Sequence, residues 1–339
     1  MKAVVCSSPH AIAIEQLPPA LRISGEVLVQ INRAGICGTD YHIYEGLHPF
    51  LKYPRVIGHE LSATVWEADA KTGFDVGQTV VVNPYIACGL CHACTSNKPN
   101  CCMKIAVLGV HRDGGMCEFI SLPPGNLISA GSMSLDEAAS VEFLAIGAHA
   151  VRRSAIGKGH NALVVGAGPI GIGVAIFAQI AGARVTFVDR DVARLELASS
   201  VVGVANKYTA DQNISQKLND YSNGDGFDFV FDATGNRSSM EQSFSYVAHG
   251  GCYVLVGLVK DDIKFSDPEF HKREMTLMAS RNATHIDFEH VISSIKSGVV
   301  PILKLLTHRT SLEHVATDLP RWSSNKEGLI KAIVEISAT

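Results

Sequence analysis

Four cysteines are spaced closely enough to hold one metal ion. They follow the pattern C-x2-C-x2-C-x7-C, at Cys88, Cys91, Cys94 and Cys102. Four thiolates at this spacing can surround a tetrahedral Zn²⁺ completely, which is typical of a structural site. An iron–sulfur cluster is the alternative, but ferredoxin-type motifs place the fourth cysteine after three residues and before a proline. The adjacent Cys101 leaves the identity of the fourth ligand open.

A second chemical pattern is a glycine-rich turn between a predicted strand and a predicted helix. Residues 162–165 are apolar, residues 166–171 have the sequence G-A-G-P-I-G, and a helical stretch follows over 172–183. The first glycine permits a tight turn, the second admits a pyrophosphate, and the third lets the helix pack on the strand. The start of the helix offers unpaired N–H groups to phosphates. The pattern predicts a dinucleotide site formed by Gly166, Gly168, Pro169, Ile170 and Gly171.

The choice of dinucleotide depends on the end of the next predicted strand. Residues 184–188 are followed by Asp189, 18 residues beyond Gly171. A carboxylate there can bond the hydroxyls of the adenosine ribose and repels a 2′-phosphate, which favours NAD. Arg190 and Arg194 could neutralise such a phosphate, so NADP stays open as the less favoured cofactor.

A third group of residues offers metal ligands without a diagnostic spacing. Cys37 follows a strand-like segment, and His59 and Glu60 follow a proline-containing loop. One thiolate, one imidazole and one carboxylate can form the three-ligand, open site of a catalytic zinc. A further acid, Glu142, lies in an apolar stretch, where burial is costly unless the acid is paired or near a metal. The residues alone leave the alternatives of a buried thiol, a core histidine and an exposed glutamate open.

The elements that must position these residues alternate between strands and helices. Strand-like segments are expected over 2–6, 27–33, 61–68, 79–83, 107–110 and 116–122, a turn over 34–42, and one helix over 135–153 with Ser134 as N-cap and Glu137 completing a capping box. Beyond Asp189, predicted helices (192–201, 214–221, 238–248) separate apolar strands (207–209, 227–232, 251–257, 275–280). Such strands predict a parallel sheet covered on both faces. The tail is expected to form helices over 288–297 and 312–323 and a strand over 332–336 that returns to the first domain.

Length and composition set broad limits on the class of protein. A chain of 339 residues exceeds what one core normally supports, so two domains are expected. A net charge of −4 gives no reason to expect nucleic acid or an anionic membrane as a partner. The N-terminus has no signal-peptide pattern, and no apolar run reaches about 18 residues, so we expect a cytoplasmic protein without a membrane span. The nine cysteines are then thiols or metal ligands rather than disulfides, and Cys6, Cys117 and Cys252 fit no ligand pattern.

Together these motifs resemble the zinc-dependent medium-chain dehydrogenase/reductase (alcohol dehydrogenase) superfamily over essentially the whole chain. The resemblance rests on the segment 35–42, the G-H-E sequence at 58–60, the four-cysteine lobe, the glycine loop and Asp189. Within the superfamily the chain is similar to polyol and threonine dehydrogenases. The segments Y-P-R-V-I-G-H-E at 53–60 and L-G-V-H-R-D-G-G at 108–115 are most similar to a bacterial branch that contains L-galactonate dehydrogenase and the starvation-sensing oxidoreductase.

The resemblance implies an α/β fold with a GroES-like, β-rich catalytic domain and a Rossmann domain. The first would span 1–145 and 284–339, with a structural-zinc lobe at about 85–105, and the second 146–283. Two zinc ions per chain are implied, one structural and one catalytic, the latter held by Cys37, His59, Glu60 and Glu142; which acid binds directly stays open. Thr39 and His42 would relay the substrate proton through the nicotinamide ribose. Further cofactor contacts are implied for Arg194, Thr234, Gly235, Val256, Gly257 and Leu258.

The implied activity is hydride transfer from a secondary alcohol of a sugar acid or polyol to NAD⁺. An L-galactonate-type aldonate is the first candidate, and threonine or sorbitol-type polyols are alternatives. Tyr44, Phe50, Arg281 and Asn282 are candidate pocket residues. A homodimer or homotetramer is implied. The alternative interpretations are a quinone-reductase-like enzyme without catalytic zinc, which the Cys37, His59 and Glu60 set disfavours, and an NAD-binding regulatory protein without turnover.

Overall fold

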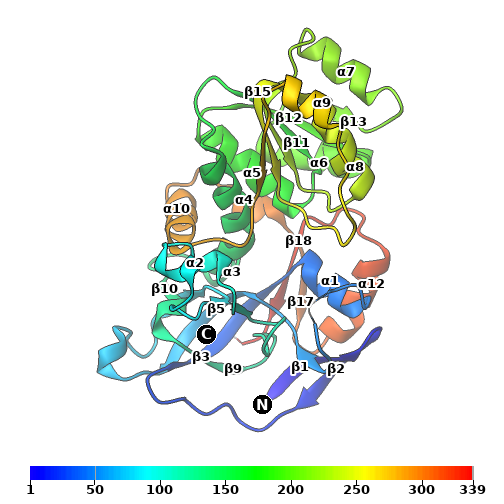
Figure 1. The fold of residues 1–339 in the computed structure, drawn as a ribbon. Helices are drawn as coiled ribbons and strands as arrows, with labels where there is room; N and C mark the ends of the chain where they lie inside the picture. The colour runs from blue at the N-terminus through cyan, green and yellow to red at the C-terminus, as the bar shows by residue number, and fades with distance from the viewer. Residues whose placement is uncertain (50, 338–339) are drawn as a thin grey trace. The chain divides into compact units, whose positions relative to one another are not determined.

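The computed structural model describes residues 1–49 and 51–337, so the pocket candidate Phe50 lies outside the described residues. The chain divides into two compact units, Met1–Glu142 with Thr284–Thr339, and Phe143–Ala283. Figure 1 shows the first unit in blue, cyan and orange-red, because both ends of the chain contribute to it. No helix of the described chain is long and apolar enough to cross a membrane.

The first unit is built on a seven-stranded, mostly antiparallel sheet. Its strand order is β10-β6-β5-β3-β18-β17, and β9 pairs with β3 off this path. The strands are β3 (Val27–Ile36), β5 (Glu60–Glu67), β6 (Thr79–Val82), β9 (Phe119–Leu122), β10 (Leu127–Ser129), β17 (Leu306–Ser311) and β18 (Lys331–Glu335). Fully buried β-branched residues occupy alternate positions of β3, at Val27, Val29 and Ile31, and most of β6, at 80–82, as expected for strands of a core. The prediction that the last strand returns to the first domain is confirmed, because Ala332 pairs with Ile36 in an antiparallel ladder.

Smaller elements surround this sheet. A three-stranded sheet contains β2 (Ala11–Gln16), β1 (Lys2–Ser8) and β4 (Arg55–Val56), in that order. A two-stranded sheet pairs β7 (Tyr85–Ile86) with β8 (Ala106–Val107). The helices of the unit are α1 (Gly38–Tyr44), α2 (His92–Thr95), α3 (Leu135–Ala139), α10 (His285–Lys296), α11 (Ile302–Leu305) and α12 (Val315–Ser324). Residues of both larger sheets and of α12 share one apolar core.

An ion cluster joins the C-terminal segment of the first unit to its N-terminal part. Asp136 of α3 accepts from Arg33 at 3.2 Å and from Arg309 of β17 at 2.5 Å, and Arg309 also contacts Glu335 at 2.7 Å. Partial burial alone would raise the pKa of Asp136, but the hydrogen bond and charge of Arg309, with those of Arg33, hold it below its usual range. The cluster therefore favours the folded position of β17.

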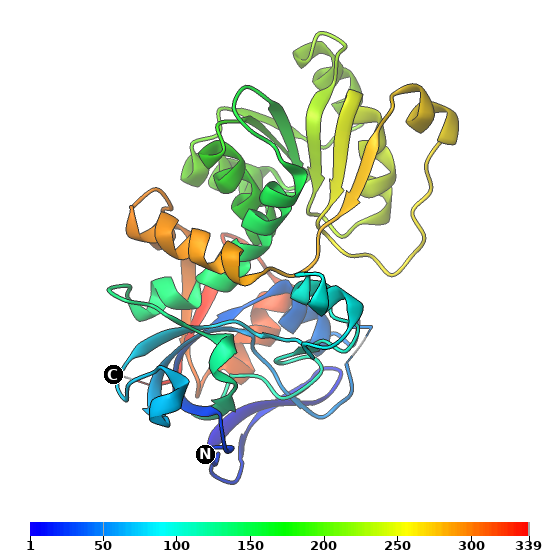
Figure 2. The ribbon, with the colours of Figure 1, turned by 60° about the vertical axis from the view of Figure 1, so that its left-hand side comes forward.

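The second unit contains a six-stranded parallel sheet. Figure 2 shows its strands side by side with helices packed against them. The order is β13-β12-β11-β14-β15-β16, for β11 (Asn161–Val165), β12 (Arg184–Asp189), β13 (Asn206–Thr209), β14 (Phe227–Asp232), β15 (Val247–Leu255) and β16 (Thr276–Ala279). The helices are α5 (Pro169–Ile180), α6 (Val192–Val202), α7 (Ile214–Tyr221), α8 (Arg237–Ser243) and α9 (Asp267–Lys272), and α4 (Val141–Ser154) begins at the boundary of the two units. The predicted parallel sheet is confirmed.

Several sequence predictions of local structure are wrong. Residues 38–44 form helix α1 instead of a turn, because the Asp40 side chain accepts from the Cys37 N–H and starts the helix. The single helix expected over 135–153 is two helices, since the first ends at Ser140; its Ser134–Glu137 capping box is confirmed. The helix expected over 238–248 ends early because Val247 already pairs with Phe227 in the sheet. Of the strand expected over 107–110 only Val107 is extended, as the last residue of β8, and β2, β17 and α9 are not among the predicted elements.

Candidate metal and cofactor sites

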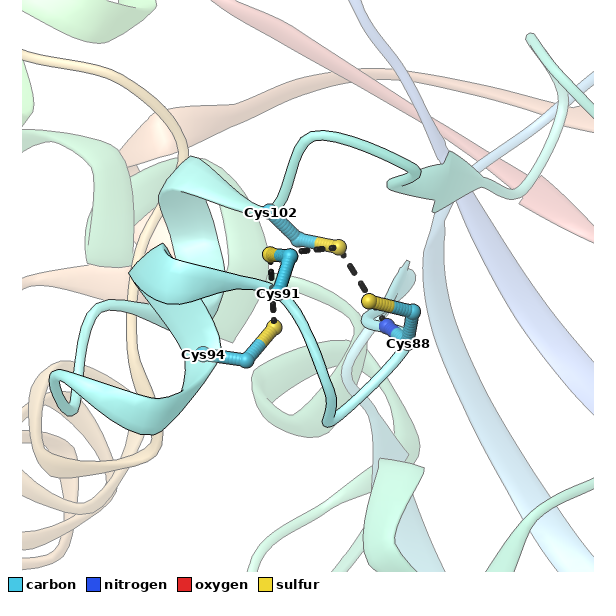
Figure 3. Close-up of side chains that lie close together, drawn as sticks. All are labelled: Cys88, Cys91, Cys94 and Cys102. Carbon is cyan, nitrogen blue, oxygen red and sulfur yellow. Dashed lines mark hydrogen bonds between the residues drawn. The ribbon is translucent and has the colours of Figure 1, made fainter.

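The four cysteines of the C-x2-C-x2-C-x7-C pattern face one another (Figure 3). The Sγ atoms of Cys88, Cys91, Cys94 and Cys102 all lie within 4.8 Å of one another. Cys101 is exposed and outside this group. Backbone N–H groups, of Met103 first and then of Cys94, lower the pKa of the Cys91 thiol to about 6, which favours the thiolate that binds metal. Four unbridged thiols at this separation fit a closed tetrahedral zinc site.

A second cluster of ligand atoms forms where β3 and β5 run side by side. The ligand atoms of Cys37, His59 and Glu60 lie within 4.8 Å of one another. Cys37 directly follows β3 and is the N-cap of α1, while Glu60 begins β5 and pairs with Gly35. A Cβ atom at Gly35 would lie 2.1 Å from Glu60 Oε2, so only glycine leaves room for this carboxylate. The antiparallel register therefore brings together residues from two separate segments.

The buried side chain of Asp40 organises the backbone around this cluster. Its Oδ2 accepts from the Cys37 N–H at 2.8 Å and its Oδ1 from the Gly58 N–H at 3.2 Å. His59 Nδ1 lies 3.9 Å from Asp40 Oδ1, which is too far for a hydrogen bond. Burial alone would lower the pKa of His59, but the negative charges of Cys37 and Asp40 raise it well above its ordinary value. A single carboxylate thus holds the segments that carry two of the ligands.

The donor set fits a divalent metal ion. His59 is 5% exposed, and its Nδ1 has no hydrogen-bond partner among the described residues. The Cys37 thiol interacts directly with the imidazole of His59, so a sulfur and a ring nitrogen already face each other where a metal ion would be bound. Thiolate, imidazole and carboxylate together match the ligands that zinc takes in catalytic sites.

Sequence reasoning missed Lys331, a fully buried lysine at this cluster. Its Nζ lies 2.7 Å and 2.8 Å from the two carboxylate oxygens of Glu60 and 3.2 Å from the carbonyl oxygen of Ile36. Burial alone would lower the pKa of Lys331, but the Glu60 carboxylate raises it above its ordinary value. Glu60 is therefore shared between the metal cluster and an ammonium group from the opposite end of the chain.

Glu142 is buried beside the cluster and has a different partner. It lies outside the group of ligand atoms within 4.8 Å, and its Oε1 accepts a hydrogen bond from the hydroxyl of Tyr85. Burial raises the pKa of the Glu142 carboxyl to about 7. The alternative of a solvent-exposed glutamate at this position is wrong. Tyr85 is a second residue that the sequence did not single out.

The proposed relay residues lie on α1. Thr39, in its first turn, is half-buried, and His42, in its last turn, is exposed. Tyr44 ends the same helix and packs edge-on against His10. The other pocket candidates, Arg281 and Asn282, follow β16 in the second unit. Their roles stay predictions.

The glycine loop of the second unit has the geometry expected for a bound pyrophosphate. Gly166 has φ +99°, and a Cβ atom at Gly171 would lie 1.8 Å from the Gly166 carbonyl oxygen, so the loop requires both glycines. Gly168 is the N-cap of α5, Pro169 and Ile170 begin this helix, and no side chain caps it. A Cβ atom at Gly168 would meet nothing within 4 Å. The uncapped helix start and the open space before it fit a phosphate group.

The remaining cofactor candidates follow the carboxyl ends of neighbouring parallel strands. Asp189 ends β12, and its carboxylate accepts from the Ala167 N–H at 2.7 Å and from the Asp191 N–H at 2.9 Å. Arg190 is exposed, and Arg194 of α6 is half-buried. The other candidates follow β14 and β15, as Thr234, Gly235, Val256, Gly257 and Leu258. In open α/β sheets ligands bind at this edge of the strands, so all these residues share one candidate site.

The two folds and the two clusters define a class of protein: a GroES-like unit with two candidate metal sites and a Rossmann unit with a dinucleotide loop. Residues 23–132 match the alcohol dehydrogenase GroES-like domain, and residues 169–297 match the zinc-binding dehydrogenase family. The chain belongs to the zinc-type alcohol dehydrogenases of the medium-chain superfamily and is an oxidoreductase. The resemblance seen in the sequence is thereby confirmed.

Relatives cover nearly the whole chain. L-galactonate-5-dehydrogenase of Escherichia coli K12 is 40% identical over 339 residues, with 98% of each chain covered. Starvation-sensing protein RspB of the same organism is 30% identical, with 99% of this chain and 100% of RspB covered. The crystal structure of the rspB alcohol dehydrogenase of E. coli CFT073, complexed with NADH, superposes with a TM-score of 0.92 at 28% identity and 99% coverage of both chains.

The buried pair of Lys331 and Glu60 generates a stability prediction. Lys331→Met leaves the Glu60 carboxylate buried without its ammonium partner, and we expect the free energy of unfolding to fall by about 3 kcal/mol. Glu60→Gln combined with Lys331→Met should cost less, because both charges are removed together. Denaturant unfolding at a fixed zinc concentration measures both variants. A Lys331→Met cost no larger than that of Lys304→Met, a change at an exposed lysine of α11, would contradict the importance of the pair.

Proposed function

We propose that this protein oxidises a secondary alcohol of a sugar acid, with an L-galactonate-type aldonate as the first candidate. The observation that carries the reaction class is the cluster of Cys37, His59 and Glu60, in a chain that also carries a dinucleotide loop. The 40% identity to L-galactonate-5-dehydrogenase supports the substrate class. Threonine and sorbitol-type polyols are the alternative substrates.

In this proposal the alcohol carbon gives a hydride to the nicotinamide, and its oxygen loses a proton, so a ketone is formed. Zinc bound by Cys37 and His59 with one of the two glutamates would supply a Lewis acid that lowers the pKa of the alcohol. Thr39 and His42 accept and pass on the proton. The placement of Thr39 at the half-buried start of α1 and of His42 at its exposed end supports a path toward solvent.

The second zinc in this proposal is structural. Its four thiolates would leave no coordination position for a substrate, so it would stabilise the loop between β7 and β8 and take no part in the chemistry. A protein that binds the dinucleotide without turnover is the non-enzyme alternative, and the complete donor set of the second cluster argues against it.

The cofactor in this proposal is NAD. Asp189 is fixed at the end of β12 by two backbone N–H groups, so its carboxylate cannot easily withdraw from a 2′-phosphate. Repulsion of that phosphate disfavours NADP. The NADH bound in the related rspB structure supports the same choice.

The reaction is tested by NADH formation at about 340 nm, the nicotinamide absorption band. We expect turnover with L-galactonate, little with threonine or sorbitol, and loss of turnover when a chelator removes zinc, because the donor set needs the metal to activate the alcohol. Turnover of threonine alone would keep the reaction and overturn the substrate. Turnover that survives complete zinc removal would overturn the mechanism.

The cofactor choice is tested by Asp189→Ser. This change removes the charge that repels a 2′-phosphate, and we expect the ratio of kcat/KM for NADP to that for NAD to rise by at least about tenfold. Asp225→Ser, which removes an exposed carboxylate in the turn after α7 of the same unit, is the control and should alter the ratio much less. An unchanged ratio in Asp189→Ser would refute the role given to this residue.

A further inference from the structure

Tyr85 places a phenol hydroxyl against one of the two buried glutamates of the candidate catalytic site. The side chain is 8% exposed, and its hydroxyl donates to Oε1 of Glu142. Its ring packs edge-on against Phe288 of α10, with ring centroids 6.4 Å apart and an interplanar angle of 76°. A buried phenol aimed at a buried carboxylate restricts the orientations open to that carboxylate.

The backbone of Tyr85 is fixed by two buried asparagines. The Tyr85 N–H donates to Asn83 Oδ1 at 3.1 Å, and the Tyr85 carbonyl oxygen accepts from Asn126 Nδ2 at 3.2 Å. The same Asn126 amide donates to the Asn83 carbonyl oxygen at 2.9 Å. The hydroxyl therefore projects from a residue whose main chain and ring are both held in place.

Tyr85 also begins the short sheet at the base of the four-cysteine lobe. It pairs with Val107 and Ile86 pairs with Ala106, so β7 and β8 close the two ends of the loop that contains the cysteines. Cys88 follows β7 after one residue. Strand β7 therefore carries the Tyr85 hydroxyl and leads directly into the loop that holds the candidate structural zinc site.

The two glutamates have partners of different charge. The positively charged ammonium of Lys331 donates to both carboxylate oxygens of Glu60. The neutral hydroxyl of Tyr85 donates only to Oε1 of Glu142. An ammonium competes directly with a metal ion for a carboxylate, and a neutral donor on one oxygen does so far less. Lys331 therefore offsets part of the charge of Glu60, whereas Glu142, which lies outside the group of ligand atoms, keeps its other oxygen free of the Tyr85 hydrogen bond.

We propose that Tyr85 is a positioning residue that orients Glu142 toward the metal held by Cys37 and His59. This inference rests on the proposed zinc-dependent function. Tyr85 touches neither substrate nor dinucleotide in this assignment and acts only through the carboxylate. Outer partners of metal ligands commonly change metal affinity or activity by about 10–100-fold when they are removed.

The experiment replaces the catalytic zinc by Co²⁺ in the full chain and records the visible absorption of the bound ion. Tyr85→Phe keeps the ring against Phe288 and removes only the hydroxyl. We expect a changed cobalt spectrum, Co²⁺ binding weaker by about tenfold or more, and a kcat lowered by a similar factor with little change in KM. The four-cysteine zinc should be retained.

A matched control separates this effect from the general loss of a buried hydroxyl. Tyr253→Phe, in the second unit, removes a buried hydroxyl that donates to the Met240 carbonyl oxygen at 2.9 Å. We expect its cobalt spectrum to equal that of the unchanged protein. In a Glu142→Ala background, Tyr85→Phe should have no further effect on cobalt affinity, because the residue through which it acts is gone.

A Tyr85→Phe protein with unchanged spectrum and affinity, or effects of Tyr85→Phe and Glu142→Ala that simply add, would overturn the proposal. If Tyr85→Phe does not fold, 3-fluorotyrosine at residue 85 keeps the ring and strengthens the donor. The spectrum should then still shift, and an unshifted spectrum would overturn the proposal. The cobalt spectrum is recorded without substrate. If the unchanged protein oxidises none of the alcohols, that result counts against the proposed function, and the cobalt spectrum still tests the role of Tyr85.

Discussion

The buried ion pair of Lys331 and Glu60 is the contact on which the candidate catalytic site most depends. It joins the first residue of β18 to the first residue of β5, 271 residues apart in sequence. Burying either charge alone would be strongly unfavourable, so the folded state needs both strands in register on the same sheet. That register also places Glu60 beside Gly35 and Cys37 at the end of the intervening strand β3. Strand β18, near the C-terminus, is therefore needed to hold Glu60 in the candidate catalytic site.

The site as a whole concentrates negative charge around one imidazole. His59 lies near four acidic groups, those of Cys37, Asp40, Glu60 and Glu142. Each of the three carboxylates is held by a hydrogen bond of its own: from backbone N–H groups for Asp40, from an ammonium for Glu60 and from a phenol for Glu142. Such restraints fix ligands before a metal binds, which lowers the cost of ordering them and excludes other arrangements. The four-cysteine lobe obeys the same principle with backbone N–H groups directed at sulfur.

The parts of the molecule that sequence predicted best are those whose chemistry is local. The glycine loop, the acid at the end of β12 and the four-cysteine spacing each lie in one short segment, where spacing alone fixes geometry. Lys331 and Tyr85 escaped notice because their partners are 271 and 57 residues away, and a single buried lysine or tyrosine has no local pattern. Helix α1 was missed because its start depends on a hydrogen bond that the Cys37 N–H donates to the Asp40 carboxylate. The end of α3 at Ser140 has no sequence signal either, because the apolar stretch continues into α4.

The zinc content of the purified chain and of Cys37→Ser shows directly whether the two groups of ligand atoms hold one zinc ion each. The unchanged protein should contain one zinc for each group, and Cys37→Ser should keep only the zinc of the four-cysteine lobe while the chain stays folded. A folded Cys37→Ser protein with the zinc content of the unchanged chain would contradict this assignment, and so would an unchanged protein that takes up zinc at the four cysteines alone.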